Sequence, residues 1–437
     1  MKKVFIKNLG CPKNEVDGAI LLSLLEQNNM YPTGDPAYAD IVIVNSCGFI
    51  DSAKEESIHE VLRLAQLKSK RSFKLVLAGC LAQRYKEIIN KEMPEVDLVV
   101  GIANLSAARD KIMGLRTCGN GDRRHARGYR EYPALQKTAG LPYAYLKISD
   151  GCDNLCSYCA IPMIRGRYRS RRISSIVNEA KYLAKNGVVE LILVAQDTTV
   201  YGTDLYGRQK LVELLGKLEN IGDIRWIRLL YTHPAHYYDL LVDYLGYSEK
   251  VVPYLDLPLQ HMSDNILKLM NRKVNSGKIK RLIDRLREKI KDLALRTTYI
   301  IGFPGEVEAD FKCLYDFQKD YGIERVGVFP YSREEGTKAG TSKEEVPEHV
   351  VAERIDRLMT LALDQSYERN GGFIGKKLEV LIDEKDKDGY YRARGYDQAP
   401  EIDGHIRARG RFMPGRFYDI KVVDFEAYDL EAIEWKE

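Results

Sequence analysis

The stretch DGCDNLCSYCAIP, residues 150–162, says most about what kind of protein this chain forms. Within it, Cys152, Cys156 and Cys159 follow the spacing C-x3-C-x2-C. Three thiolates this close on one loop are typical of a metal site, but a structural zinc ion takes four ligands and the loop contains no histidine. The nearest one, His125, lies far upstream. The set therefore favours an iron-sulfur cluster that leaves one iron open for a small ligand.

The spacing, with Tyr158 as the aromatic residue before the last cysteine, resembles the signature of the radical S-adenosylmethionine (SAM) superfamily. The resemblance implies that Cys152, Cys156 and Cys159 hold a [4Fe-4S] cluster whose open iron binds SAM. The plainer alternatives are a zinc knuckle or a chance clustering of cysteines.

Length and composition limit the kind of molecule that can carry this motif. A chain of 437 residues, 45% hydrophobic and 30% charged, is expected to form two or three globular domains. The amino terminus turns polar before a secretory segment could form, and no apolar run is long enough to span a membrane. Eight cysteines are too few for a disulfide scaffold and suit a reducing compartment, so we expect a cytoplasmic protein. A net charge of +4 is too small to indicate a nucleic-acid partner.

Three further cysteines each follow a predicted strand in the amino-terminal region. VFIKNL precedes Cys11, DIVIVNS precedes Cys47 and FKLVLAG precedes Cys80, with helical patterns between them. The carboxyl ends of parallel strands share one edge of an open α/β sheet, so these thiols are expected to meet and to hold a second cluster. The alternative is that they are ordinary buried cysteines. Cys118 and Cys313 belong to neither cysteine pattern and are interpreted as structural or incidental.

Six βα units follow a predicted linker at residues 119–140 and indicate a partial (βα)6 barrel over residues 141–370. Active residues of such barrels lie where strands end. The candidates are Gln196, Asp197, His233, Gln260, His261 and the turn from Gly302 to Glu306.

Each candidate has a structural alternative. Histidines such as His233 and His261 are more often oriented structural groups than catalysts. The glycines of GFPGE alone are a weak nucleotide signal, but similar turns line the SAM pocket of the family that the cysteine motif resembles. That resemblance assigns cofactor binding to Tyr158, Gln196, Gly302 and Gly305.

An uninterrupted positive run follows the cysteine loop. A solvated face explains most such runs, whereas the alternative is that one or two of these side chains hold a carboxylate of cofactor or substrate. The run consists of Arg165, Arg167, Arg169, Arg171 and Arg172.

Residues 371–437 show short strands and turns and predict a small β-barrel. It resembles the TRAM domain, an OB-like module, and such barrels often bind nucleic acid. Residues 372–437 contain 12 Lys plus Arg but 15 Asp plus Glu, which suits a basic protein partner better than phosphates. We expect acids such as Glu401 and Asp403 to take part in docking.

The whole chain is similar to the methylthiotransferases, with an amino-terminal α/β domain at residues 1–118, the radical barrel and TRAM. LGCPKNEVD, VAQDTTVYG and LDLPLQH resemble the branch that modifies ribosomal protein, whereas the tRNA branch typically reads GCQMN at the first position. The resemblance implies two [4Fe-4S] clusters, SAM, and an electron donor such as flavodoxin or ferredoxin. The substrate is then an aspartate β-carbon of small-subunit ribosomal protein number twelve.

The implied reaction is a methylthio insertion at an unactivated C–H bond, which has no proton acidic enough for a general base and therefore needs a radical cofactor. The resemblance assigns SAM cleavage to the cluster of Cys152, Cys156 and Cys159, and sulfur delivery to the cluster of Cys11, Cys47 and Cys80. Two alternatives remain open: a tRNA methylthiotransferase, and a non-enzymatic iron-sulfur scaffold or redox protein.

Overall fold

The computed structural model describes residues 2–115 and 140–436. The predicted linker at 119–140 therefore lies, except for Gly140, outside the described residues, as do Cys118 and His125. The chain divides into two compact units. The first consists of Met1–Lys137, Ser149–Asp153 and Cys159–Glu179, and the second of Thr138–Ile148, Asn154–Tyr158 and Ala180–Glu437.

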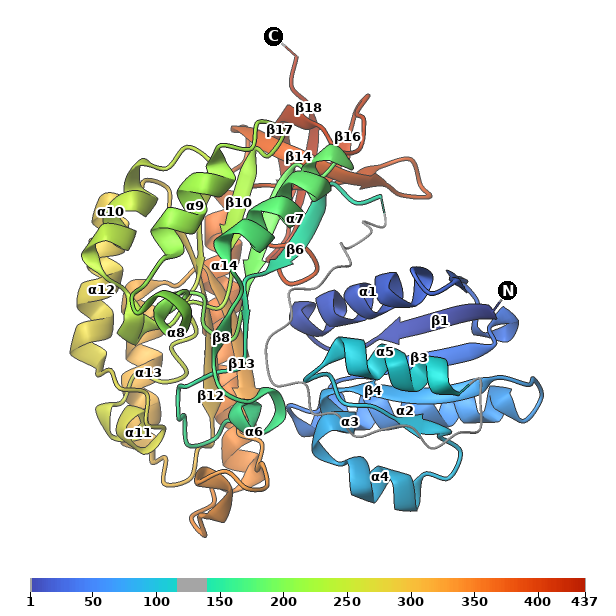
Figure 1. Cartoon of the computed structure of the whole chain (residues 1–437). Helices are drawn as coiled ribbons and strands as arrows, with labels where there is room; N and C mark the ends of the chain where they lie inside the picture. The colour runs from blue at the N-terminus through green and yellow to red at the C-terminus, as the bar shows by residue number, and fades with distance from the viewer. Residues whose placement is uncertain (1, 116–139, 437) are drawn as a thin grey trace. The chain divides into compact units, whose positions relative to one another are not determined.

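The first unit is built on an open parallel sheet, as the sequence predicts, with strand order β2-β1-β3-β4-β5 (Figure 1). Its central strand β3 (Ile41–Ser46) is buried at every position, which explains its continuous apolar run. On either side lie β1 (Lys2–Asn8) and β4 (Lys74–Gly79), and the edges are β2 (Met30–Pro32) and β5 (Leu98–Val99). All of these pairings are parallel, so the carboxyl ends of β1, β3 and β4 are neighbours.

Helices cover both faces of this sheet. Helix α2 (Asp51–Lys68) packs Val61 and Leu64 against Val42, Val44 and Leu77 in one apolar core. Helices α1 (Pro12–Glu26) and α5 (Leu105–Gly114) pack against each other, while α3 (Cys80–Arg84) and α4 (Lys86–Glu92) follow β4. The unit also contains α6 (Ile161–Arg165), the start of α7 (Ile173–Lys185), and the short antiparallel pair β7 (Ser149–Asp150) and β8 (Arg169–Ser170).

The second unit contains a six-stranded parallel sheet, in which each strand lies beside the next one in the chain. This order makes the predicted partial barrel. Its strands are β6 (Tyr143–Lys147), β9 (Glu190–Val194), β10 (Trp226–Leu229), β11 (Val251–Asp256), β12 (Ala294–Ile301) and β13 (Arg325–Pro330).

Helices form a layer along this sheet (Figure 1). They are α9 (Leu211–Glu219), α10 (Asp239–Tyr247), α12 (Ser276–Lys289) and α13 (Glu308–Tyr321), with the shorter α8 (Thr203–Tyr206) and α11 (Asp264–Leu269) in the loops. The long α14 (Glu348–Gly371) packs against α13 and β13 and ends where the predicted β module begins. No helix in the described part of the chain is long and apolar enough to cross a membrane.

A closed five-stranded barrel ends the chain and confirms the predicted β module. Its core contains Val380, Ile382, Ile406, Ile420 and Val422. The strands are β14 (Lys377–Lys385), β15 (Tyr391–Arg394), β16 (Ile406–Arg409), β17 (Phe417–Phe425) and β18 (Leu430–Glu434).

Buried ion pairs join this barrel to the amino ends of the six-stranded sheet. Glu190, at the start of β9, contacts Arg228 of β10 at 2.8 Å and Arg394 of β15 at 2.8 Å. Arg394 also pairs with Asp383 at 2.6 Å. Although burial alone would raise the pKa of Glu190, the two guanidinium groups lower it. The barrel thus occupies the amino edge of the sheet, and the carboxyl edge is left for other groups.

Asp403 belongs to the same junction, so the prediction that it docks a partner is wrong. Its carboxylate accepts a hydrogen bond from the Tyr254 hydroxyl at 2.7 Å and lies 3.6 Å from Arg296, and only 5% of the side chain is exposed. Asp383 and Asp397 are also buried in ion pairs. The acidic surplus counted from the sequence therefore does not describe the exposed surface of the barrel. Docking by the exposed Glu401 stays a prediction.

Candidate metal centres

The first unit brings Cys11, Cys47 and Cys80 to one edge of its sheet. Each follows one of three neighbouring strands: Cys11 begins the turn into α1, Cys47 comes directly after β3, and Cys80 opens α3 after β4. Cys47 and Cys80 are buried and Cys11 is partly exposed. This is the arrangement that the strand pattern predicts.

Close backbone packing sets the three loops. Gly10 has a φ of +84°, and a Cβ there would lie 2.6 Å from the Cβ of Cys47. A Cβ at Gly48 would lie 2.7 Å from the backbone nitrogen of Leu81, so the loops after β3 and β4 also touch. Only glycine fits such an approach, because any side chain would push the loops apart.

Polar side chains pin the same loops. The Asn14 amide donates to the backbone oxygens of Leu9 and Asn45, at 2.8 and 2.9 Å. Ser57 of α2 accepts a hydrogen bond from the Cys47 backbone nitrogen at 3.0 Å and donates to the Cys47 oxygen. These hydrogen bonds therefore hold the cysteine-bearing loops to their neighbours.

The electrostatics show that these thiols are close enough to interact. Burial first, and then the charges of Cys11 and Cys80, raise the pKa of Cys47 to about 11. Burial also raises the pKa of Cys80, while the charge of Arg165 opposes that rise. The Arg165 guanidinium donates to the Cys80 sulfur at 3.4 Å. A bound metal would offset the repulsion among these sulfurs, since its positive charge stabilises the deprotonated thiolates that bind it.

The second cysteine set lies in the loop between β7 and α6. Cys152 is buried, and its backbone nitrogen donates to Gly166 at 3.1 Å. A Cβ at Gly151 would lie 2.1 Å from the Arg167 oxygen, so this part of the loop also needs glycine. Cys156 and Cys159 are partly exposed.

Residues 154–158 of this loop are anchored within the second unit. The Ser157 nitrogen donates to Met270 at 3.0 Å, and the Asn271 amide donates to the Leu155 oxygen at 2.6 Å. The buried Arg272 lies 3.7 Å from the Cys156 sulfur, within the hydrogen-bonding range for sulfur. Arg272 therefore places a positive charge beside a predicted cluster ligand.

Tyr158 packs into the turn that the sequence links with SAM. Its ring meets Phe303 edge to face at 6.4 Å between centroids. Gly302 and Gly305 of this turn have φ values of +77° and +83°, and a Cβ at Gly302 would lie 2.5 Å from Val351 of α14. The turn is thus a tight glycine turn packed against the cysteine loop.

Three of the predicted site residues, Gln196, His233 and His261, carry buried polar atoms without hydrogen-bond partners among the described residues. The oxygen and the nitrogen of the Gln196 amide both lack a hydrogen-bond partner among the described residues, and so does the Nε2 of His233. Ala235 donates to the Nδ1 of His233, so the neutral ring carries its proton on Nε2 as a donor. Burial first, and then the charge of Arg272, lower the pKa of His233 to about 2 and keep the ring neutral. Such atoms fit a polar ligand, because unpaired buried polar groups are costly.

Asp197 and His261 make internal contacts. Asp197 accepts hydrogen bonds from Asn154 at 2.8 Å and from the backbone of Thr199 at 3.0 Å, and its carboxylate lies 2.7 Å from a His236 nitrogen. Burial would raise the pKa of Asp197, but the hydrogen bond with His236 lowers it. The Nδ1 of His261 accepts a hydrogen bond from the Ser263 backbone, and its Nε2 lies 3.6 Å from the Glu306 carboxylate.

Glu306, the last residue of the turn, is also used inside the fold. Its carboxylate accepts a hydrogen bond from the Gly302 nitrogen at 2.9 Å and pairs with Arg354 at 2.8 Å. Gln260 adopts a φ of +71° and forms an isolated bridge with Tyr299, so the strand predicted over YLDLPLQ ends earlier, at Asp256.

The arginine run does not form one solvated face. Arg167 is exposed, with 90% of its side chain accessible, whereas Arg165 and Arg171 are buried. Arg171 pairs with Glu179 at 2.6 Å. Arg165 does hold carboxylates, but they are those of Asp17 and Asp150 in the protein itself.

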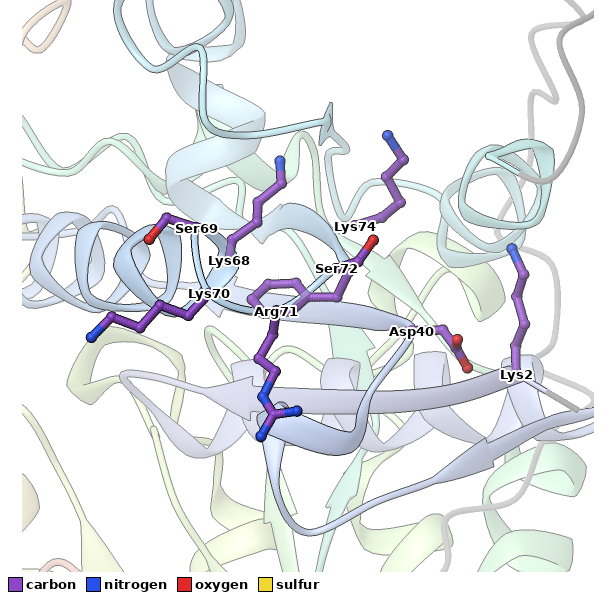
Figure 2. Close-up of a pocket in the computed structure, with 9 residues that line it drawn as sticks. Lys2, Asp40, Lys68, Ser69, Lys70, Arg71, Ser72 and Lys74 are labelled. Carbon is purple, nitrogen blue, oxygen red and sulfur yellow. The ribbon is translucent and has the colours of Figure 1, made fainter.

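A surface pocket of about 580 Å³ lies at the amino ends of β1 and β4, opposite to the cysteine edge of that sheet. It is rich in basic side chains, but the ends of Lys70 and Arg71 point away from those of Lys68 and Lys74 (Figure 2). Lys68 and Lys74 both pair with Asp97. The pocket therefore has no convergent set of donors and is separate from the cysteine chemistry.

Sequence reasoning missed the roles of Arg272, Asn154 and His236. Arg272 lies in an ordinary basic stretch, and only the fold brings it to Cys156. Asn154 stands inside the cysteine motif, and His236 stands three residues after His233, so the spacing H-P-x-H was an available signal. Cys313 is exposed on α13, away from both cysteine sets in the sequence.

Comparison with known families identifies the class. The model of the Radical SAM superfamily matches residues 146–317, that of the TRAM domain matches 374–433, and that described as "Uncharacterized protein family UPF0004" matches 3–101. The chain is therefore a radical SAM protein with the domain order that the sequence predicts.

Relatives then give the family. The chain is 46% identical over 98% of its length to "Ribosomal protein uS12 methylthiotransferase RimO" of Acetivibrio thermocellus, covering 97% of that protein. It is 44% identical over 98% of its length to the protein of the same name from Lachnoclostridium phytofermentans, covering 99% of it. The chain belongs to the RimO-type radical SAM methylthiotransferase family, which uses SAM and [4Fe-4S] clusters.

Solved structures agree on the fold. The radical SAM methyltransferase TsrM of Kitasatospora setae, with cobalamin and a [4Fe-4S] cluster bound, superposes with a TM-score of 0.55 at 12% identity, covering 78% of this chain and 74% of that one. At that identity the likeness shows the fold alone.

Proposed function

We propose that this protein adds a methylthio group to the β-carbon of an aspartate in ribosomal protein uS12. The observation that carries the proposal is the near full-length identity to proteins named for uS12 methylthiolation. The meeting of Cys11, Cys47 and Cys80 supports it, because a methylthiotransferase needs a sulfur-supplying site besides the one that cleaves SAM.

In this proposal each cysteine set holds one [4Fe-4S] cluster. Cys152, Cys156 and Cys159 hold the cluster that binds SAM, and Cys11, Cys47 and Cys80 hold the other. The residues fit such groups: each set offers three thiols, and each includes a cysteine contacted by a buried arginine. Hydrogen bonds to cluster sulfur are a known means of tuning a cluster. When bound, SAM and the clusters would allow a hydrogen atom to be removed from an unactivated carbon, and they would supply the sulfur that replaces it.

The chain's own residues shape the place where SAM binds. We assign Gln196 as a hydrogen-bonding group to SAM, because both of its amide atoms are buried and unpartnered among the described residues. Tyr158, Gly302 and Gly305 form one wall, since the Tyr158 ring packs on the turn that the two glycines allow. The neutral His233 offers a further N–H donor toward a bound carboxylate or hydroxyl.

We further propose functional boundaries, partners and location. The division is an amino-terminal domain at residues 1–118, a linker at 119–140, a radical barrel at 141–370 and TRAM at 371–437, supported by the three family matches. A flavodoxin or ferredoxin supplies single electrons, as radical cleavage of SAM requires. The ribosomal substrate and six thiols kept for metal support a cytoplasmic location.

The two alternatives make different demands. A tRNA methylthiotransferase would use the same cysteines, but the relatives quoted carry the uS12 name. A scaffold or redox protein would hold clusters without cleaving SAM, whereas the unpartnered polar atoms of Gln196 and His233 favour a bound ligand.

Mass spectrometry of uS12 and of tRNA from a strain that lacks the gene tests the proposal. We expect the methylthio group to disappear from the uS12 aspartate and the tRNA modifications to persist. Complementation with the native gene should restore the uS12 mark, and complementation with Cys156→Ala should not. Loss of a tRNA methylthio group with uS12 unaffected would transfer the protein to the other branch.

A further inference from the structure

Arg165 lies between the two cysteine-bearing segments of the first unit. Its guanidinium contacts Asp17 of α1 at 2.8 Å, Asp150 of β7 at 3.1 Å and the Cys80 sulfur at 3.4 Å. In the sequence, Asp17 follows Cys11 by six residues, Asp150 precedes Cys152 by two, and Arg165 follows Cys159 by six. One side chain therefore joins the amino-terminal cysteine site to the loop of the other cysteine set.

The contacts lock this guanidinium in place. An arginine has five N–H donors in a rigid plane, so two carboxylates can hold it while another N–H points at the sulfur. The Arg165 side chain is only 2% exposed, and those of Asp17 and Asp150 are 1% and 5% exposed. Water therefore screens this charge very little, and its effect on a neighbouring group is strong.

A structural ion pair alone would not need the contact with Cys80. Arg171 provides the comparison within the same unit: it is equally buried, pairs with Glu179 at 2.6 Å and donates a hydrogen bond to the Ser175 hydroxyl at 3.1 Å. Arg165 differs from Arg171 in that it reaches a predicted cluster ligand. Hydrogen bonds to sulfur and local net charge are among the factors that set the reduction potential of an iron-sulfur cluster.

We propose that Arg165 is a positioning residue that fixes the Cys80 sulfur and raises the reduction potential of the amino-terminal cluster. The inference rests on the proposed function, because it presupposes a cluster at Cys11, Cys47 and Cys80. Reduction adds one electron to the cluster, and a fixed positive charge stabilises that added charge. Removing the charge must therefore shift the potential to more negative values.

The test uses the full-length chain with Cys152, Cys156 and Cys159 replaced by alanine, so that only the amino-terminal site is read. In this background Arg165→Gln should bind iron with a more negative midpoint potential than native Arg165. It should also lose iron to a chelator about tenfold faster, as substitutions in the outer shell of a metal site typically do. Arg171→Gln is the matched control and should change neither quantity.

Arg165→Lys separates charge from geometry. The ammonium keeps the charge but cannot bridge the three partners as a planar fork does, so its potential should stay nearer to native while iron is still lost faster. If Arg165→Gln is insoluble, the rates of iron loss from Arg165→Lys and Arg171→Lys are compared instead. Equal behaviour of the Arg165 and Arg171 variants would overturn the inference. Absence of iron from the background protein with native Arg165 would instead refute the proposed amino-terminal cluster.

Discussion

The two cysteine sets of this protein are encoded in different ways. Cys152, Cys156 and Cys159 lie within eight residues of one loop, whereas Cys11, Cys47 and Cys80 follow three separate strands. The first set is a local motif that a sequence shows directly. The second exists only because parallel strands bring their carboxyl ends to one edge. The local set should therefore tolerate changes elsewhere in the fold, while the dispersed set should depend on the whole sheet.

Both sets nevertheless share a feature that neither motif contains. Arg165 contacts Cys80 and Arg272 contacts Cys156, and each guanidinium is buried. In each case a buried positive charge lies beside the sulfur of a predicted ligand. The two sets thus differ in how the fold brings their cysteines together, but in both a guanidinium group lies beside a cysteine sulfur.

The largest expected effect separates the sets by removing the local one. Replacing Cys152, Cys156 and Cys159 with alanine should leave about half of the iron, because one of two four-iron sites remains, and should abolish 5′-deoxyadenosine formation from SAM. Iron analysis and chromatography of the reaction products measure both quantities. Loss of all the iron, or of none, would contradict the two-site account.

The reverse change should have a narrower effect. A variant with alanine at Cys11, Cys47 and Cys80 should still cleave SAM when reduced, because the other cysteine set is intact, but should transfer no methylthio group. Product analysis of a single reaction reads both activities. Full transfer by this variant would end the assignment of sulfur delivery to the dispersed set.

A glycine substitution tests the dependence of the dispersed set on the fold. Gly10→Ala places a Cβ 2.6 Å from Cys47 at a φ of +84°, so we expect a loss of about 2–4 kcal/mol and a reduced amino-terminal iron content. Gly207→Ala is the control, because its φ of +70° carries a similar backbone cost and nothing lies within 4 Å of the new Cβ. Thermal unfolding and iron analysis should separate the two. Equal effects would show that steric contact with Cys47 does not matter.

The smallest effect concerns the charge beside the local set. Arg272→Gln should weaken iron retention at the SAM-binding cluster about tenfold and lower its potential, because it removes the donor to Cys156. Arg272→Lys should keep more of the potential. Spectroscopic titration in a chain that lacks Cys11, Cys47 and Cys80 measures this cluster alone. Unchanged potential and unchanged iron retention in this background would break the parallel with Arg165.

Sequence patterns predicted the three-part architecture because strand and helix periodicities here are strong. The buried strand IVIVNS and the amphipathic α12 are two such cases. Both cysteine sets were also predicted, since cysteines after strands and the C-x3-C-x2-C spacing are local signals.

The patterns could not predict long-range contacts. Arg272 and Arg165 are ordinary basic residues in the sequence, and only the tertiary fold brings them to sulfur. The prediction that Asp403 docks a partner failed for the same reason. An acid in a loop is usually exposed, but contacts with Tyr254 and Arg296 bury this one. Net charge over a segment therefore says little about its surface when several acids are buried in ion pairs.

The most direct test of the account is transfer by the purified protein. Anaerobic protein with both clusters, supplied with reductant, SAM and sulfide, is offered uS12 in one reaction and tRNA in another, and both are analysed by mass spectrometry. The account predicts that the native chain replaces one hydrogen of a uS12 aspartate by a methylthio group, forms 5′-deoxyadenosine, and leaves tRNA unmodified. Methylthiolated tRNA with unmodified uS12, or SAM left intact by the reduced protein, would contradict it.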